Sequence, residues 1–373
     1  MLCRKPKTRP MNDDIVLRYK SIALFKAAAE AVAPLVELAV SERTETKIEL
    51  CARVFRAVAD SNCASTGEWL EKLILRDENP FGRAAARGER IAEHIKAQAQ
   101  SELSTFKRLS LVKPSGAVDC VPKFVYGGFT LDYDRLVDFF GNHGCGALAC
   151  GNMFKATCDG LRRFSVDYRL SDLAGYAEEH AELLRNTENF VSCLPAFHTL
   201  LCGDRGTGKT SAVRALGQEF SSLKIIEVDG VELLPTLISK LSGYKQKHIL
   251  FVDGLPRDMP REAQIILERA LDDAGPNILV YCTTGGSQTR GADGGRSESV
   301  FDRFGLVVTF VTPDRDGFAE VLKAILRRRG MRWREEYASI AELAALKCGS
   351  RSPRTAKQIA DIIETTYAES NNG

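Results

Sequence analysis

One stretch of eight residues, 203–210, constrains the fold of this chain more than any other part of its sequence. It reads G-D-R-G-T-G-K-T and lies between an apolar run at residues 199–202 and a segment with the spacing of an amphipathic helix. Glycines in such a loop let several backbone N–H groups point inward at one phosphate, and the N-terminus of the following helix adds partial positive charge. The pattern therefore predicts a P-loop, which binds the phosphates of a nucleotide.

Two side chains of the loop and one from elsewhere are expected to bind phosphate and Mg²⁺. Lys209 should reach the β- and γ-phosphates, and the Thr210 hydroxyl should be a ligand of Mg²⁺. Asp253 ends a second apolar run, residues 249–253, and should supply a carboxylate to the metal; its alternative role is that of a capping residue in a turn. The nucleotide-binding residues predicted from the loop are Gly203, Asp204, Arg205, Gly206, Thr207, Gly208, Lys209, Thr210 and Ser211.

The region around the loop alternates apolar runs with helical periodicity, which is the pattern of an α/β fold with a parallel sheet. The helical segments between the runs would cover both faces of that sheet. The expected strands after the loop are residues 224–228, 248–253, 278–283 and 306–311.

These patterns divide the chain into four parts. Residues 1–11 are expected to be a disordered tail, and residues 12–160 a mainly helical N-terminal region because apolar residues recur there at three- and four-residue spacing. Residues 161–313 would form the P-loop α/β core, and residues 314–373, which have only helical periodicity, a C-terminal lid. The boundary is placed near residue 160 because the preceding stretch is dense in Gly and Cys.

Composition argues against several classes of protein. Lys and Arg number 51 against 49 Asp and Glu, so there is no clear nucleic-acid signal beyond a basic cluster at residues 4–9, which we interpret as part of the tail. No apolar run is long enough to predict a membrane helix, and no signal peptide is evident. The odd number of cysteines, 11, indicates reduced thiols, so a cytoplasmic protein is expected.

Beyond the P-loop, the strand end at Asp253 and the stretches 302–305 and 349–356 together resemble AAA+ ATPases. More narrowly, the chain is similar to bacterial AAA+ ATP-binding proteins of the domain of unknown function 815 family. The likeness covers residues 77–369, most firmly 165–369, and implies a P-loop NTPase fold with ATP between the core and the helical lid. The stretches that carry it are residues 77–81, 183–189, 203–210 and 302–305.

The resemblance implies roles for two arginines and one further segment. Arg303 matches the arginine finger that reaches the γ-phosphate of a neighbouring subunit, which implies a ring-forming homo-oligomer; the alternative is a surface ion pair with Asp302. Arg354 matches the sensor-2 arginine of the lid, with a solvated helix-terminal arginine as the alternative. Residues 168–175 match the segment that packs on the adenine ring.

Two positions depart from the AAA+ pattern. The acid that usually follows the metal-binding Asp, and activates the attacking water, is replaced by Gly254. The sensor-1 position usually holds Asn, whereas this chain offers Thr283 or Thr284, and Thr284 is our candidate for a catalytic residue beside Arg303. Since loss of a general base slows a reaction by about 10²- to 10⁴-fold, we expect tight binding of Mg-ATP with slow hydrolysis or none. The alternative is that one of the nearby acids Asp258, Glu262 and Glu268 compensates.

Three functions are compatible with these residues. The first is a nucleotide-gated switch or scaffold, favoured by Gly254. The second is an active motor or remodelling ATPase that works as a ring on protein or nucleic acid, favoured by Arg303. The third and weakest is a small-molecule P-loop kinase. In each case the N-terminal region would bind an unknown protein partner.

Overall fold

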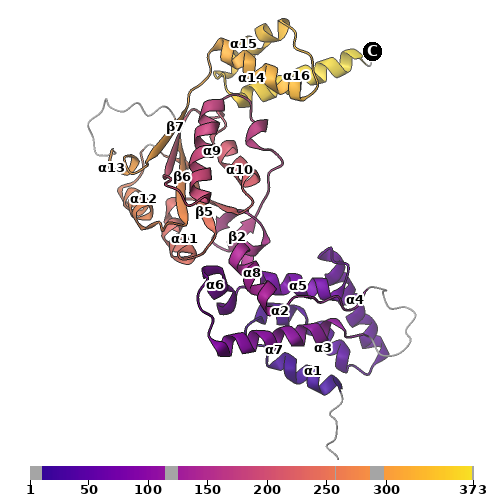
Figure 1. Ribbon diagram of the computed structural model, residues 1–373. Coiled ribbons are helices and arrows are strands. Elements are labelled where there is room, and N and C mark those ends of the chain that lie inside the picture. Colours follow the sequence, from indigo (N-terminus) through magenta and orange to yellow (C-terminus); the bar gives the residue numbers. More distant parts are fainter. Residues whose placement is uncertain (1–10, 114–124, 257, 286–297, 372–373) are drawn as a thin grey trace, which may run out of the picture. The chain divides into compact units, whose positions relative to one another are not determined.

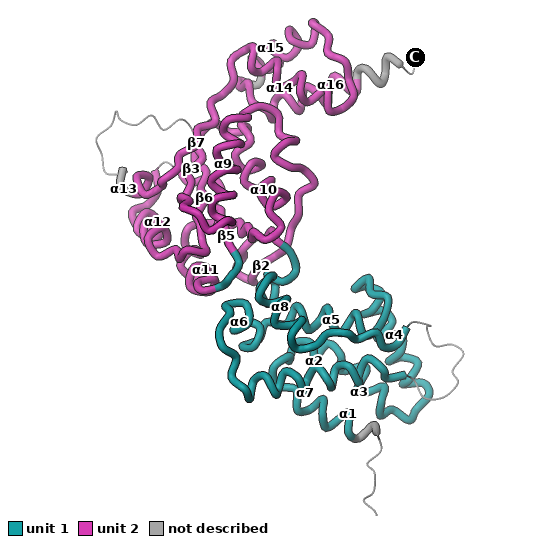
Figure 2. The backbone as a smooth tube through the Cα atoms, viewed as in Figure 1, with its two compact units in different colours: residues 1–151, 244–246 teal, residues 152–243, 247–373 magenta. Residues whose placement is uncertain are grey.

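A computed structural model describes residues 11–113, 125–256, 258–285 and 298–371 (Figure 1). The chain divides into two compact units, Met1–Gly151 together with Tyr244–Gln246, and the remainder (Figure 2). The basic cluster and most of the expected tail, residues 1–10, lie outside the described part of the chain. Within the described residues, none of the helices combines the length and apolar character needed to cross a membrane.

The first unit is built from helices, as the apolar spacing predicted. Short polar side chains begin several of them: the side chain of Ser65 accepts a hydrogen bond from the N–H of Glu68, and that of Asn79 from the N–H of Gly82. The helices are α1 (Met11–Lys20), α2 (Lys26–Ala31), α3 (Ala33–Val40), α4 (Thr44–Asp60), α5 (Thr66–Arg76), α6 (Pro80–Arg87), α7 (Glu93–Ser110) and α8 (Tyr133–His143), followed by the short 3-10 helix η1 (Gly146–Cys150).

Aromatic side chains fill the core of this unit. Phe81 is fully buried and contacts the rings of Phe25 and Phe140 edge-on, with centroids 6.1 and 6.0 Å away. The distant segment Tyr244–Gln246 belongs here because its backbone and side chains bond to α6 and α8: the Lys245 N–H donates to the Ala86 carbonyl. Residues Tyr244–Gln246, which lie in the sequence between α11 (Leu234–Leu241) and β5 (Lys247–Leu255) of the second unit, are thus part of the helical unit.

The second unit contains a seven-stranded sheet in the order β2-β1-β4-β5-β6-β3-β7. Among the described strands, the pair β1–β2 is antiparallel and the other neighbours are parallel, as predicted from the alternation of strands and helices. The strands are β1 (Met153–Thr157), β2 (Gly160–Arg163), β3 (Thr199–Gly203), β4 (Leu223–Val228), β5 (Lys247–Leu255), β6 (Ile278–Thr284) and β7 (Leu306–Phe310).

Helices cover both faces of this sheet. Figure 1 shows α9 (Ala177–Val191) and α10 (Lys209–Glu219) on one face, and α11 (Leu234–Leu241) and α12 (Arg261–Asp273) on the other. After the last strand come α14 (Arg315–Arg328), α15 (Glu336–Cys348) and α16 (Pro353–Asn371), which pack around their own apolar cluster as a helical lid. The α/β P-loop fold with helical N- and C-terminal parts is confirmed.

The division of the chain differs from the expected boundary near residue 160. The second unit begins at Asn152, because β1 pairs in parallel with β4 and so belongs to the sheet. Neither β1 nor β2 was expected from the sequence. Both are short, and their place in the sheet depends on pairing with strands that other parts of the chain supply.

Candidate nucleotide-binding site

Polar bonds from α9 anchor the strands that carry the site. Asn186 donates to the hydroxyls of Thr199, on β3, and of fully buried Tyr281, on β6, at 3.1 and 3.0 Å. The adjacent Thr187 bonds the same Tyr281 hydroxyl at 2.9 Å. Residues 183–189, part of the stretch that carried the family resemblance, therefore hold β3 and β6 in register below the loop that follows β3.

The P-loop lies where predicted, between the carboxyl end of β3 and the N-terminus of α10. The ammonium of Lys209 folds over the loop and donates to the carbonyls of Gly203 and Asp204, at 2.7 and 2.8 Å. Burial lowers the pKa of Lys209, and the carboxylates of Asp253 and Asp204 act in the opposite direction. A phosphate on the loop would take the place of these carbonyl partners.

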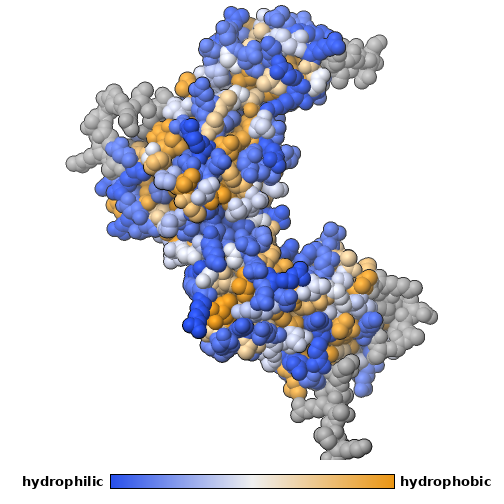
Figure 3. All heavy atoms as spheres, in the orientation of Figure 1, coloured by the Kyte–Doolittle hydropathy of each residue, from blue (hydrophilic) through white to orange (hydrophobic). Residues whose placement is uncertain are grey.

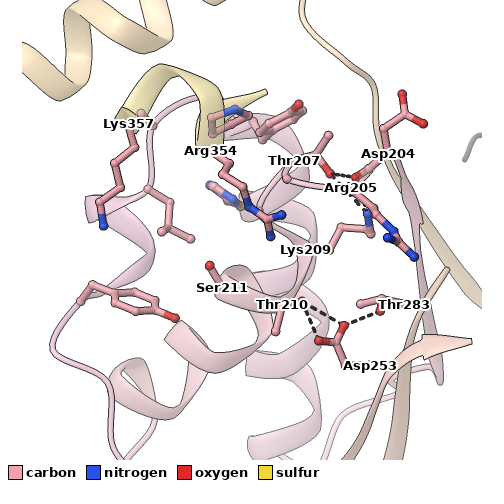
Figure 4. A pocket seen from close by; sticks show the side chains of 18 of the residues that line it. Asp204, Arg205, Thr207, Lys209, Thr210, Ser211, Asp253, Thr283, Arg354 and Lys357 are labelled. Atoms are coloured by element: carbon pink, nitrogen blue, oxygen red, sulfur yellow. Dashed lines mark hydrogen bonds between the residues drawn. The ribbon is translucent and has the colours of Figure 1, made fainter. Parts of the chain in front are cut away.

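Sheet topology brings the predicted metal ligands together. Strand β6 lies between β3 and β5, so the three carboxyl ends meet at one edge of the sheet. The Thr210 hydroxyl is 2.9 Å from both carboxylate oxygens of Asp253, and the Thr283 hydroxyl donates to Asp253 at 2.6 Å (Figure 4). Asp253 thus lines the cavity beside Thr210, the position expected for a carboxylate ligand of the metal.

Hydroxyl and carboxylate oxygens suit Mg²⁺, which binds through one or two protein oxygens and completes its shell with phosphate and water. Among the described residues there is no cluster of three or more His, Cys, Asp or Glu side chains that could hold a metal ion without such help. The donor set of Thr210 and Asp253 therefore fits a cation that arrives with a nucleotide.

The two threonines at the end of β6 have different positions. Thr283 contacts Asp253 and also accepts a bond of 2.7 Å from the N–H of Gly254. Thr284 is buried, and its hydroxyl donates to the carbonyl of Leu255 at 3.2 Å, a contact between β6 and β5. Of the two candidates for the sensor-1 position, Thr283 is the one that is hydrogen-bonded to Asp253, the predicted metal ligand.

Gly254 lines the cavity and has a backbone conformation that other residues adopt at a cost. Its φ is +85°, and the pairing of β5 with β6 shifts between Val252 and Leu255, so Asp253 and Gly254 form a bulge at the strand end. A Cβ built at Gly254 would meet no atom within 4 Å. There is therefore space for a side chain at position 254, although the residue there is glycine.

The lid approaches the P-loop through the first turn of α16. The N–H of Arg354 donates to the carbonyl of Gly206 at 3.3 Å. A Cβ on Gly206 would lie 2.8 Å from the Ser352 hydroxyl, so only glycine permits this approach. Arg354 itself lines the cavity, as expected for a residue of the lid.

The cavity between P-loop and lid has a volume of about 1230 Å³ and also has an apolar, aromatic wall. Tyr176 packs on the Phe310 ring at 5.0 Å and donates to the Val311 carbonyl at 3.0 Å. Burial lowers the pKa of His180 to about 4, so this imidazole is neutral at pH 7. The wall is made of Tyr168, Leu173, Ala174, Tyr176, His180 and Ile325. Tyr168, Leu173 and Ala174 fall in the segment expected to pack on adenine, whereas Tyr176 and His180 were not anticipated.

Arg303 does not line this cavity. Its guanidinium forms an ion pair with Asp272 at the end of α12, and both side chains are partly exposed. From the sequence, Asp302 was the alternative partner considered for Arg303, whereas the partner in the structure is Asp272. A role for Arg303 at the site of a neighbouring subunit stays a prediction.

Comparison with known proteins gives one family match. Residues 153–287 and 296–367, more than half of the chain, match the family described as protein of unknown function (DUF815). No curated protein matches the sequence. Solved structures similar to the chain include the RuvB Holliday junction branch migration motor of Thermotoga maritima, at 16% identity and a TM-score of 0.41, and two variants of it, at 17% and 15% identity with TM-scores of 0.41 and 0.42. Each match covers 54% of this chain and 66% of the RuvB chain.

Proposed function

This chain belongs to the DUF815 family, and we propose that it binds Mg-ATP between its P-loop and its lid, hydrolyses it slowly, and acts as a nucleotide-gated switch or scaffold. The observation that carries the proposal is the convergence of Lys209, Thr210 and Asp253 at one edge of the sheet. An ammonium, a hydroxyl and a carboxylate in this arrangement match the groups that a Mg-bound triphosphate requires.

Slow hydrolysis follows from what surrounds the metal-binding carboxylate. The cavity lining includes three acids, Asp172, Asp204 and Asp253. Asp172 accepts the N–H of Arg169 and Asp204 accepts the Thr312 hydroxyl, while Asp253 accepts two hydroxyls. Asp172 and Asp204 are hydrogen-bonded outside the metal site and Asp253 faces Thr210, so in this proposal none of the three acids of the described lining replaces the acid missing at Gly254.

The nucleotide of this proposal is ATP, with the adenine against the aromatic wall that includes Tyr168 and Tyr176. Arg354 would contact phosphate from the lid and so link the position of α16 to the state of the nucleotide. A switch uses such a link directly, because a ligand that prefers one lid position shifts the population toward it.

Self-association and partner binding complete the proposal. Arg303 is partly exposed at the surface of the second unit, where it could serve a neighbouring copy in a homo-oligomer. The same observation favours the alternative function, an active motor or remodelling ATPase working as a ring. The helical first unit would bind a protein partner, and we expect the assembly to work in the cytoplasm.

The role of the metal can be tested by removing its carboxylate. Asp253→Asn keeps the size of the side chain and its hydrogen-bonding oxygen but removes the charge that holds Mg²⁺. We expect the wild type to bind ATP at least about tenfold more tightly in Mg²⁺ than in EDTA, and the variant to lose most of that difference. Calorimetric titration measures both affinities, and Asp172→Asn is the matched control at a cavity acid outside the metal site. An unchanged Mg²⁺ dependence in Asp253→Asn would contradict the assignment.

A further inference from the structure

Helix α16 brings a second positively charged side chain to the cavity. Arg354 and Lys357 are three residues apart in this helix, and both line the cavity. Side chains at this spacing share one face of a helix, and the second lies about 4.5 Å farther along the axis. Lys357 is thus a lid residue at the nucleotide site to which the family resemblance assigned no role.

The positive charges of Arg354 and Lys357 are not neutralised by the described carboxylates of the lid. Helix α16 also contains Asp361 and Glu364, but these two carboxylates pair with Arg329 at 2.6 and 2.8 Å. Within the described part of the chain, neither the guanidinium of Arg354 nor the ammonium of Lys357 has an ion-pair partner. Two exposed cations of like charge on one helical face favour an anion between them and the P-loop.

The view of the cavity indicates which part of a nucleotide Lys357 faces. In Figure 4 its ammonium lies on the side of Ser211, away from the metal-binding Asp253, and Arg354 lies between Lys357 and Lys209. The β- and γ-phosphates belong beside Lys209 and the metal site. A phosphate chain that extends from there past Arg354 would therefore approach Lys357 with its other end.

The lid also contacts the segment that contributes Tyr168, Leu173 and Ala174 to the wall of the cavity. Arg328 of α14 donates to the carbonyl of Ser171, and Ala174 packs against the apolar cluster of the lid. Ser171 and Ala174 both lie in residues 168–175, the segment proposed to contact the adenine. Lys357 therefore belongs to a lid that contacts the segment proposed to bind the nucleoside.

From this placement we propose that Lys357 binds the phosphate nearest the nucleoside, so that α16 contacts the phosphate chain at two points, Arg354 at the distal end and Lys357 at the proximal end. The inference rests on the proposed ATP site. It implies that Lys357 responds to any nucleoside phosphate, whereas Arg354 responds to the number of phosphates.

The test compares calorimetric affinities of the full chain for ATP, ADP and AMP. Lys357→Ala should weaken all three by a similar factor, about 5- to 10-fold, as expected for one partly exposed charge-assisted hydrogen bond. Lys357→Arg, which keeps the charge, should stay within about twofold of wild type. The matched control is Lys347→Ala, at an exposed lysine of α15 that does not line the cavity, and it should change nothing.

Two results would overturn the inference while leaving the proposed function intact. If the wild type binds ATP and Lys357→Ala binds all three nucleotides as well as wild type, Lys357 is not a ligand. If the loss is confined to ATP, Lys357 contacts the distal phosphates and the proximal assignment is wrong. Failure of the proposed function has a different signature, since the wild type itself would then not bind ATP.

Discussion

Replacing Lys209 by alanine is expected to weaken ATP binding by about 100-fold, the loss of two charge-assisted hydrogen bonds to phosphate. The lysine ammonium is held over the loop by the carbonyls of Gly203 and Asp204, and burial already lowers its pKa. A triphosphate would restore a full anionic partner to this partly desolvated charge. The affinity of the purified variant for Mg-ATP, measured by calorimetry, checks the prediction.

Lys347→Ala is the matched control for this experiment, because it removes one lysine from the exposed surface of α15. Its affinity for ATP should equal that of the wild type. Thermal unfolding of both variants should stay close to wild type, which would show that the loop change is local. If Lys209→Ala still bound ATP within about threefold of wild type, the nucleotide could not lie on the P-loop.

Supplying an acid at position 254 is expected to raise turnover by at least about tenfold, a fraction of the 10²- to 10⁴-fold that a well-placed general base provides. Gly254 directly follows Asp253, the proposed metal ligand, lines the cavity and leaves open space for a Cβ. The full effect is not expected, because its φ of +85° strains any other residue by about 1–2 kcal/mol. The variant Gly254→Glu should bind Mg-ATP about as tightly as wild type and release phosphate faster.

Gly254→Ala separates the chemistry from the backbone strain. It introduces the same Cβ and the same strained φ but no carboxylate, so its turnover should equal or fall below that of the wild type. Phosphate release at saturating Mg-ATP compares the three proteins. Equal rates for Gly254→Glu and Gly254→Ala would mean that water activation does not depend on an acid at this position.

Local patterns were enough to predict most of the second unit. The P-loop between a strand and a helix, the later parallel strands and the three lid helices all follow from apolar periodicity and glycine spacing, and the structure contains them. The same patterns led to Asp253, because a carboxylate at the end of a buried strand is visible in one sequence segment. Asp253 comes close to Thr210 because β5, which carries Asp253, and β3, which leads into the P-loop, end at the same edge of the sheet.

Features that depend on distant parts of the chain could not be predicted. Strand β1 is defined by pairing with β4, and Tyr244–Gln246 joins the helical unit through bonds to α6 and α8. The sequence does not show which of Thr283 and Thr284 faces Asp253, because that depends on how β6 pairs with β5; in the structure it is Thr283. Lys357 belongs to no sequence motif, and its spacing of three residues from Arg354 was the available signal. That spacing points to the cavity only when the position of α16 beside the P-loop is known.

The most direct test of the central claim is the steady-state rate of phosphate release by the wild-type protein at saturating Mg-ATP, with the Lys209→Ala rate subtracted. An enzyme with an intact water-activating acid would be expected to reach at least about 1 per second. Because Gly254 replaces that acid, we predict a rate below about 0.01 per second. A Lys209-dependent rate near 1 per second would contradict the account and favour the motor ATPase.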